Sequence, residues 1–118
     1  MKSKFKPGVL AEITFDFKTG KHKVYDDLMG EREVGGKYID VVRDQLAYLR
    51  EIQKRGTSPR PQQLVDDIKA YELLLSQPNP EEACEVYGRI SDEARSSAFG
   101  AKHFRKKTAL QKMGIWKD

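Results

Sequence analysis

Cysteine is almost absent from the 118-residue sequence, which holds only Cys84. A single cysteine cannot form a disulfide within the chain, so we expect a protein of a reducing compartment, most simply the cytoplasm. Cys84 follows Ala83 in a helical pattern, which favours a small buried side chain over a nucleophile. A Cys84–His103 pair is conceivable as a nucleophile and base, but no further residue pattern supports it.

Long apolar runs are also missing. Stretches such as residues 73–75 are far too short for a helix that spans a bilayer. The first residues, MKSKFKPG, are charged and lack the apolar run of a secretory signal. We therefore expect a cytoplasmic protein that makes no membrane contact.

Motifs for metal binding and catalysis are the third absence. Cys84, His22 and His103 lie far apart, with no CxxC or HxxxH spacing, so we expect no metal site. Both histidines adjoin lysines, which is typical of a solvated basic surface. Adjacent carboxylates occur, but no candidate base accompanies them. We therefore predict a non-enzymatic protein without a cofactor.

Charge is present in quantity and is unevenly distributed. Residues 1–23 carry six lysines against two acids, a net charge of +4. Residues 24–99 carry ten bases against fifteen acids, a net charge of −5, and residues 100–118 carry six bases against one acid, a net charge of +5. Basic ends around an acidic middle suit contact with a polyanion, and they equally suit ends that dock on the middle of the same chain.

The N-terminal part has the pattern of a β-hairpin. Apolar and polar residues alternate from Ala11 to Phe17, the period of a strand with one buried face. Residues 18–21 supply a turn, and residues 22–25 return as a shorter strand. An isolated hairpin is barely stable in water, so its apolar face is expected to pack on helices. Residues 26–36 are expected to form a charged, glycine-containing loop.

Helical periodicity dominates the rest of the chain. The stripe from Tyr38 to Ile52 is the widest, so we predict a central helix there, ending near Gly56. A second helix is predicted from Pro61 to Gln77. A third is predicted from Asn79, which would cap it, and it either continues or breaks between Gly88 and Ser91.

The predicted fold is therefore α+β, with an N-terminal β-hairpin packed on a bundle of three to four α-helices. We expect one domain over residues 1–118: a basic arm at 1–8, the hairpin at 9–25, a helical core at 37–99 and a basic C-terminal segment at 100–118. The predicted core consists of Ile13, Phe15, Phe17, Val24, Ile39, Val42, Leu46, Leu49, Leu64, Ile68, Tyr71, Leu75, Val86 and Ile90.

The basic terminal segments are the first candidate for function. Phosphate backbones need several cations within reach, and interleaved aromatic residues can stack on exposed bases. We therefore predict a small accessory protein that binds the phosphate backbone of DNA or RNA and uses its acidic helical middle on a protein partner. The predicted nucleic-acid-binding residues are Lys102, His103, Arg105, Lys106, Lys107, Lys112, Lys2, Lys4 and Lys6.

The alternative is a protein-interaction module without nucleic-acid binding: an adaptor, an inhibitor or an assembly subunit, either as one chain or self-associated. Aromatic and methionine side chains beside the main apolar stripes support it, because such residues are favoured at interface centres. The predicted interface residues are Tyr25, Met29, Tyr48, Phe99 and Trp116.

Overall fold

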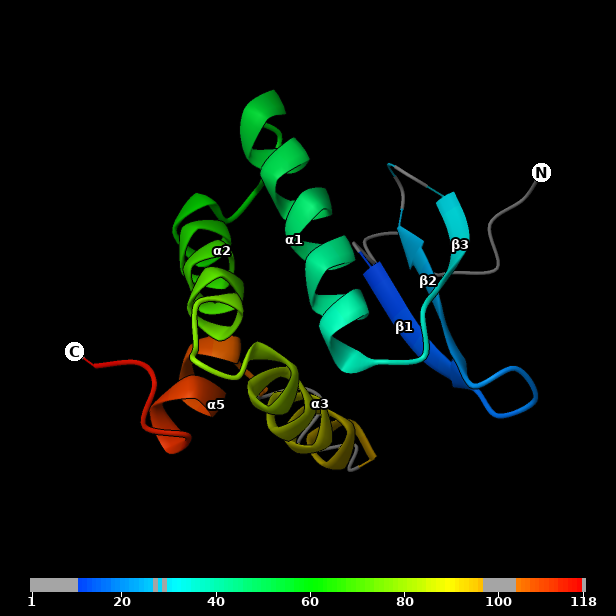
Figure 1. Cartoon of the computed structure of the whole chain (residues 1–118). Helices are drawn as coiled ribbons and strands as arrows, with labels where there is room; N and C mark the ends of the chain where they lie inside the picture. Colours follow the sequence, from blue (N-terminus) through cyan, green and yellow to red (C-terminus); the bar gives the residue numbers. More distant parts are fainter. Residues whose placement is uncertain (1–10, 27, 29, 97–103, 118) are drawn as a thin grey trace.

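A computed structural model of the chain places a small antiparallel sheet beside a group of packed helices (Figure 1). It describes residues 11–26, 28, 30–96 and 104–117. The elements are β1 (Ala11–Asp16), β2 (Lys21–Asp26), β3 (Gly30–Val34), α1 (Tyr38–Arg55), α2 (Pro61–Leu75), α3 (Pro80–Ser96) and α5 (Lys106–Lys112). The predicted α+β fold, with an N-terminal hairpin and a helical bundle, is confirmed.

The hairpin is shorter than its sequence pattern. β1 and β2 pair antiparallel from Ala11 opposite Asp26 to Asp16 opposite Lys21, so the turn begins at Phe17. The prediction of Phe17 as a core residue is wrong: its side chain is 89% exposed, because it follows the last paired residue of β1. The side chains of Ile13 and Phe15, also predicted as core, lie outside those that the structure describes.

A third strand occupies the region that was predicted as a loop. β3 pairs antiparallel with β2, which makes the sheet order β1-β2-β3. Its sequence, GEREV, alternates as a strand does, but the half-buried position at its centre is Arg32 rather than an apolar residue. The Arg32 guanidinium donates to both carboxylate oxygens of Asp44 on α1, at 2.9 and 2.6 Å. An ion pair therefore joins β3 to α1. A strand that packs on a helix is usually recognised in a sequence by an apolar residue at this position.

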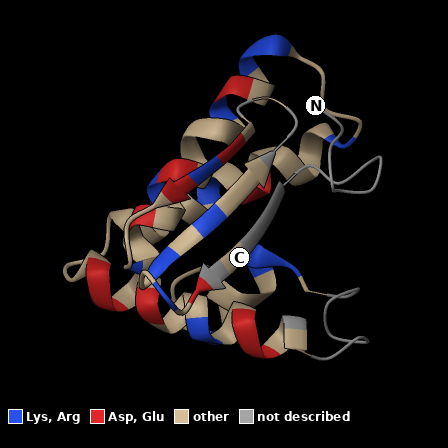
Figure 2. Cartoon of the chain, turned by 90° about the vertical axis from the view of Figure 1, so that its right-hand side faces the viewer, with Lys and Arg blue, Asp and Glu red and all other residues tan. Residues whose placement is uncertain are grey.

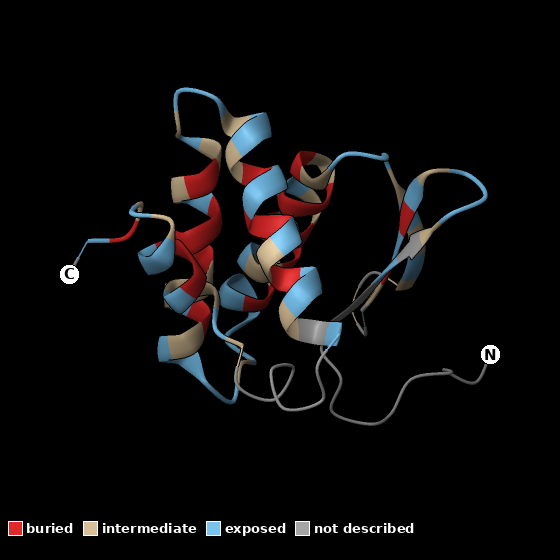
Figure 3. Cartoon of the chain, turned by 90° about the horizontal axis from the view of Figure 1, so that it is seen from below, coloured by how far each residue is buried: buried red, intermediate tan, exposed pale blue. Residues whose placement is uncertain are grey.

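α1 is the central helix. It begins at Tyr38, as predicted, and ends at Arg55. Gly56 caps it, because its positive φ of 66° allows its N–H to bond the carbonyl oxygens of Ile52 and Gln53. α1 lies between the sheet and the other helices (Figure 1) and packs on α2 and α3. The buried residues of the helices lie mainly on the sides that the helices turn toward one another (Figure 3).

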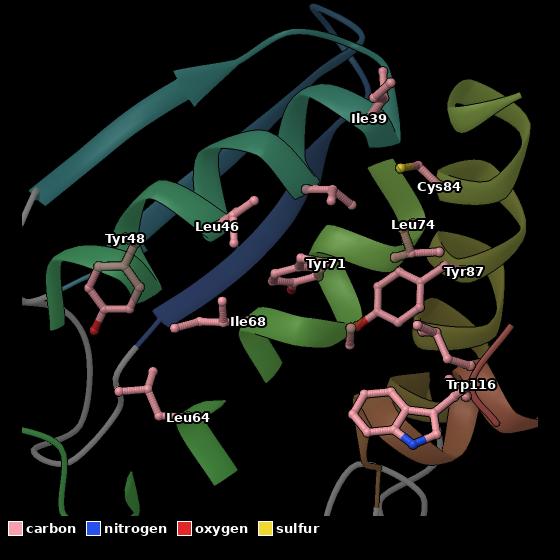
Figure 4. Close-up of a cluster of buried hydrophobic side chains, with 14 of the residues drawn as sticks. Ile39, Leu46, Tyr48, Leu64, Ile68, Tyr71, Leu74, Cys84, Tyr87 and Trp116 are labelled. Atoms are coloured by element: carbon pink, nitrogen blue, oxygen red, sulfur yellow. The ribbon is translucent and has the colours of Figure 1, made fainter. Parts of the chain in front are cut away.

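The core lies among α1, α2, α3 and α5, with Tyr48 and Leu64 at one end and Trp116 at the other (Figure 4). Half of the predicted core residues are buried, and three more are half-buried. The buried ones are Val24, Ile39, Val42, Leu46, Leu64, Ile68 and Tyr71, and the half-buried ones are Leu49, Leu75 and Ile90.

Val86 was wrongly predicted to belong to the core, since it is 43% exposed. On α3 the buried line runs through Cys84, Tyr87 and Ser91. Val86 precedes Tyr87 by one residue, which turns its side chain about 100° around the helix, away from that line.

α3 continues without a break through Gly88. The helix begins as predicted: Asn79 accepts a hydrogen bond from the Glu82 N–H at 3.2 Å, and Pro80 is the first helical residue. A side chain at Gly88 would collide with the ring of Tyr38, the first residue of α1. The glycine is therefore explained by the close approach of α1, and not by the end of a helix.

The C-terminal segment packs back on the domain. In α5, Ala109 and Leu110 are buried in the core, and Gly114 follows the helix with a positive φ of 76°. Trp116 is 6% exposed, and Ile115 is half-buried against the same core. Packing within the domain itself therefore removes Trp116 and part of Ile115 from water.

Candidate nucleic-acid interface

The described residues of the predicted nucleic-acid site gather on and around α5, which lies beside α2 and α3 (Figure 1). Arg105 precedes α5, Lys106 and Lys107 open it, and Lys112 closes it. The remaining predicted residues lie outside the residues that the structure describes; they are Lys2, Lys4, Lys6, Lys102 and His103.

Lys106 is bound within the domain. Its ammonium group lies 3.8 Å from a carboxylate oxygen of Asp67 on α2 and 5.5 Å from the centre of the Tyr71 ring. Burial raises the pKa of Asp67, and the charge of Lys106 opposes that rise. Lys106 therefore holds the C-terminal segment on α2, as expected for a basic end that docks on the acidic middle.

Two further lysines, Lys69 and Lys107, lie over the ring of Trp116. The Lys69 ammonium group, from α2, lies 4.4 Å from the centre of the Trp116 ring, and that of Lys107 lies 5.3 Å from it. Both distances are within the range of cation–π attraction. Because Trp116 is only 6% exposed, its ring interacts with these two lysines but has no open face on which a nucleic-acid base could stack.

We define the basic patch as Lys69, Arg105, Lys107, Lys112 and Lys117. All but the half-buried Lys107 are exposed. Lys69 was missed by the sequence analysis because it lies on an acidic stretch of the chain, next to Asp66 and Asp67. Only the packing of the C-terminal segment on α2 brings Lys69 to Lys107, and no local pattern in the sequence predicts that packing.

Among the described residues of the sheet side, charges of one sign are not concentrated in a comparable way. Acidic and basic segments are interspersed there (Figure 2). Lys21 lies 3.9 Å from Glu33, and Lys23 lies 3.7 Å from Asp16. Neighbouring opposite charges weaken the attraction of each lysine for an outside anion. Among the described surfaces, the basic patch is the better candidate for binding a polyanion.

Of the five predicted protein-interface residues, the structure describes Tyr25, Tyr48 and Trp116. Tyr48 is 2% exposed and Trp116 is nearly as buried, and both belong to the core. Tyr25 is half-buried on β2. Met29 and Phe99 lie outside the described residues.

A polar cluster at the junction of sheet and helices, with His22 buried, Tyr38 half-buried and Asp92 exposed, was not predicted. The sequence context of His22 suggested a solvated residue, but His22 is 3% exposed, and its Nδ1 lies 3.2 Å from the Gly35 carbonyl oxygen. Its ring contacts that of Tyr38, with centroids 5.2 Å apart. The Tyr38 hydroxyl donates to the carboxylate of Asp92 on α3. Desolvation first, and this hydrogen bond second, raise the pKa of Tyr38 to about 12.

Of the candidate catalytic pair Cys84 and His103, the structure describes Cys84. The candidate nucleophile Cys84 is fully buried, and burial raises the pKa of its thiol to about 11, which suppresses the reactive thiolate. His103, its conceivable base, lies outside the described residues. The three described residues of the cluster join β2, α1 and α3.

Comparison of the chain with protein-family models, curated proteins and solved structures finds no match. Over the described ranges, no group of His, Cys, Asp and Glu side chains is arranged to hold a metal ion. In the same part of the chain, no helix combines the length and apolar character needed to cross a membrane.

Proposed function

We propose that the chain is a small nucleic-acid-associated accessory protein that acts without catalysis and binds phosphate backbones through the basic patch. The observation that supports this proposal is the meeting of Lys69 and Lys107 over one tryptophan ring, 4.4 and 5.3 Å from its centre. Two cations from distant parts of the sequence are thereby held at one ring. A phosphate backbone rewards such an array, because each neutralised phosphate releases counterions.

The acidic helical middle is proposed to contact a protein partner. Glu82, Glu85, Val86 and Glu93 are exposed on α3, and Arg89 pairs with Glu85 among them at 2.6 Å, which leaves a net negative charge. Val86 gives this acidic surface an apolar element, and an apolar centre with a charged rim is the usual composition of a protein interface. A basic partner surface would complement it.

The test is binding of the full chain to labelled duplex DNA and to single-stranded RNA, measured by fluorescence anisotropy at several salt concentrations. The variant Lys69→Gln/Lys107→Gln removes the two cations over Trp116. For duplex DNA we expect weaker binding and a salt dependence reduced by about 0.9 for each phosphate that is no longer neutralised. Thermal unfolding of the variant checks that it still folds.

The matched control is Lys21→Gln/Lys23→Gln, which removes the same net charge from the sheet side, where both lysines have acidic neighbours. We expect this control to bind as the unmodified chain does. Equal weakening by the two double variants would show that net charge alone is responsible. Absence of binding to both nucleic acids at low salt would contradict the proposal and leave the protein-interaction module as the better hypothesis.

A further inference from the structure

A cavity of about 580 Å³ opens at the end of the core opposite Trp116. It lies between the C-terminal half of α1, the connector at residues 57–60 and the first turns of α2, and Leu28 closes one side. Its walls are mainly apolar; the apolar side chains that form them are Leu28, Tyr48, Leu49, Ile52, Pro59 and Leu64. The volume is within the range of about 300–1,000 Å³ that is typical of small-molecule sites.

The walls of the cavity are held by the fold. Tyr48, Ile52 and Leu64 are buried members of the hydrophobic core, on α1 and α2. Tyr48 and Leu64 lie at the same end of that core (Figure 4). A cavity with walls on packed helices keeps its shape before a ligand arrives, which lowers the cost of binding.

Positive charge lines part of this apolar cavity. Arg55 and Arg60 both contribute to the lining. Arg55 also donates to Glu51, one turn earlier, at 3.1 Å. Arg60 is exposed, and in the described part of the chain no ion pair engages its guanidinium. Arg60 is thus the cation beside the cavity that is available to an anion.

The local helix geometry adds to this polarity. Arg60 immediately precedes α2, whose N-terminus has neither a side-chain cap nor an acidic residue in its first turn. The partial positive charge of a helix N-terminus therefore adds to that of Arg60. Asp67 is the acidic residue of the lining, and its carboxylate lies 3.8 Å from Lys106, which balances its charge.

From this combination we propose that the cavity binds a small amphiphilic carboxylate, with its hydrocarbon part on the apolar walls and its carboxylate at Arg60. A medium-chain fatty acid has this chemistry. Arginine suits the carboxylate because its guanidinium can donate two parallel hydrogen bonds. The site is separate from the basic patch, so the inference does not depend on the proposed nucleic-acid binding.

The test uses decanoate, decanol and decyltrimethylammonium, each below its micelle concentration, with methyl NMR spectra of the full chain. We expect decanoate to bind saturably and to shift the methyl signals of Leu28, Leu49 and Leu64. We expect decanol to bind about fivefold more weakly, the upper limit for one exposed ion pair. Decyltrimethylammonium is expected to bind more weakly than decanol.

Two variants locate the two parts of the ligand. Arg60→Gln is expected to reduce decanoate affinity to that of decanol and to leave decanol binding unchanged. Gln63→Trp places a large ring in the lining and is expected to abolish binding of both. Lys54→Gln is the matched control, because Lys54 is exposed at the same end of α1 but does not line the cavity. It should bind decanoate as the unmodified chain does.

Several results would overturn the proposal. These are no saturable decanoate binding, equal affinity for decyltrimethylammonium, or an unchanged ratio of decanoate to decanol affinity in Arg60→Gln. If decanoate fails to bind and Phe5→Ala shifts the signals of the cavity, its occupant is the N-terminal segment of the chain. If those signals shift with protein concentration, the occupant is a second copy.

Discussion

Gly88 lies beneath the ring of Tyr38, and this contact explains a residue that its own helix would not favour. Glycine in a helix interior costs about 1 kcal/mol relative to alanine, so the sequence was compatible with a break at this point. The neighbour that requires glycine is 50 positions away in the chain. No local sequence pattern contains that information. The contact between Lys69 and Trp116 likewise joins residues that are far apart in the sequence, so no local pattern predicts it.

For Gly88→Ala we predict opposite effects in two backgrounds. In the unmodified chain the new methyl group collides with the Tyr38 ring, and we expect a loss of about 1–3 kcal/mol in the free energy of unfolding. In Tyr38→Ala the collision is absent, and the same change should stabilise by up to about 1 kcal/mol. Urea denaturation of the four proteins measures both effects. A loss of the same size in both backgrounds would show that Tyr38 is not the reason for the glycine.

Tyr38 should also make stability depend on alkaline pH. Its pKa is about 12 in the folded chain and about 10 when unfolded, so the unfolded chain releases this proton first. The contribution is fully present below pH 10 and is lost as the pH rises from about 10 to 12. We expect Tyr38→Phe to lose less stability than the unmodified chain over this interval.

Urea denaturation at pH 9 and pH 11 measures this loss, and titration of phenolate absorbance should show one late tyrosine that is missing from Tyr38→Phe. Tyr25→Phe is the control, because it keeps Tyr38 and its hydrogen bond to Asp92. Identical pH dependence of the unmodified chain and Tyr38→Phe would contradict the assignment.

At the scale of whole elements, the sequence predicts what is periodic and capped. α1 begins at the expected residue and ends at the expected glycine, and the Asn79–Pro80 start of α3 was also predicted correctly. β3 was missed because its inward residue is Arg32, whose partner Asp44 lies on another element. A strand stabilised by an ion pair has no apolar alternation to recognise.

The corrected orientation of α3 and the central place of α1 can be tested together. Leu46→Ala removes a side chain that is 4% exposed in the core, and we expect a loss of about 2–5 kcal/mol in the free energy of unfolding. Val86→Ala removes an exposed side chain of similar chemistry, and a change within about 0.5 kcal/mol is expected. Denaturant unfolding of both variants measures these changes in the free energy of unfolding. A loss below about 1 kcal/mol for Leu46→Ala would remove α1 from the centre of the core.

At the scale of the whole molecule, the described residues form two unequal parts. The helices share one hydrophobic core, whereas the sheet meets them chiefly at β3 and α1. Polar side chains contribute to that junction, through Arg32 with Asp44 and His22 with Tyr38. Regions with few buried apolar contacts open at lower free energy than the core.

We therefore expect the sheet to open before the helices do. In hydrogen exchange at increasing urea concentrations, the amides that pair β1 with β2 should exchange through openings of lower free energy than those of α1 around Leu46. Asp44→Asn should lower the free energy of opening of the sheet more than that of α1. A single opening energy for sheet and helices, in both proteins, would show that the molecule unfolds as one unit.

The outer edge of β3 affects whether copies of the chain associate at high concentration. No other described strand pairs with this edge, and an open edge is a template for strands of neighbouring copies. Glu31 and Glu33, both exposed, bring negative charges together whenever two such edges meet. With threonine at both positions we expect light scattering to rise at concentrations where the unmodified chain stays dispersed; unchanged scattering would mean that the edge is protected in another way. The charged residues of β3 would thus have two separate effects: Arg32 joins the strand to α1, and Glu31 and Glu33 are expected to keep neighbouring copies apart.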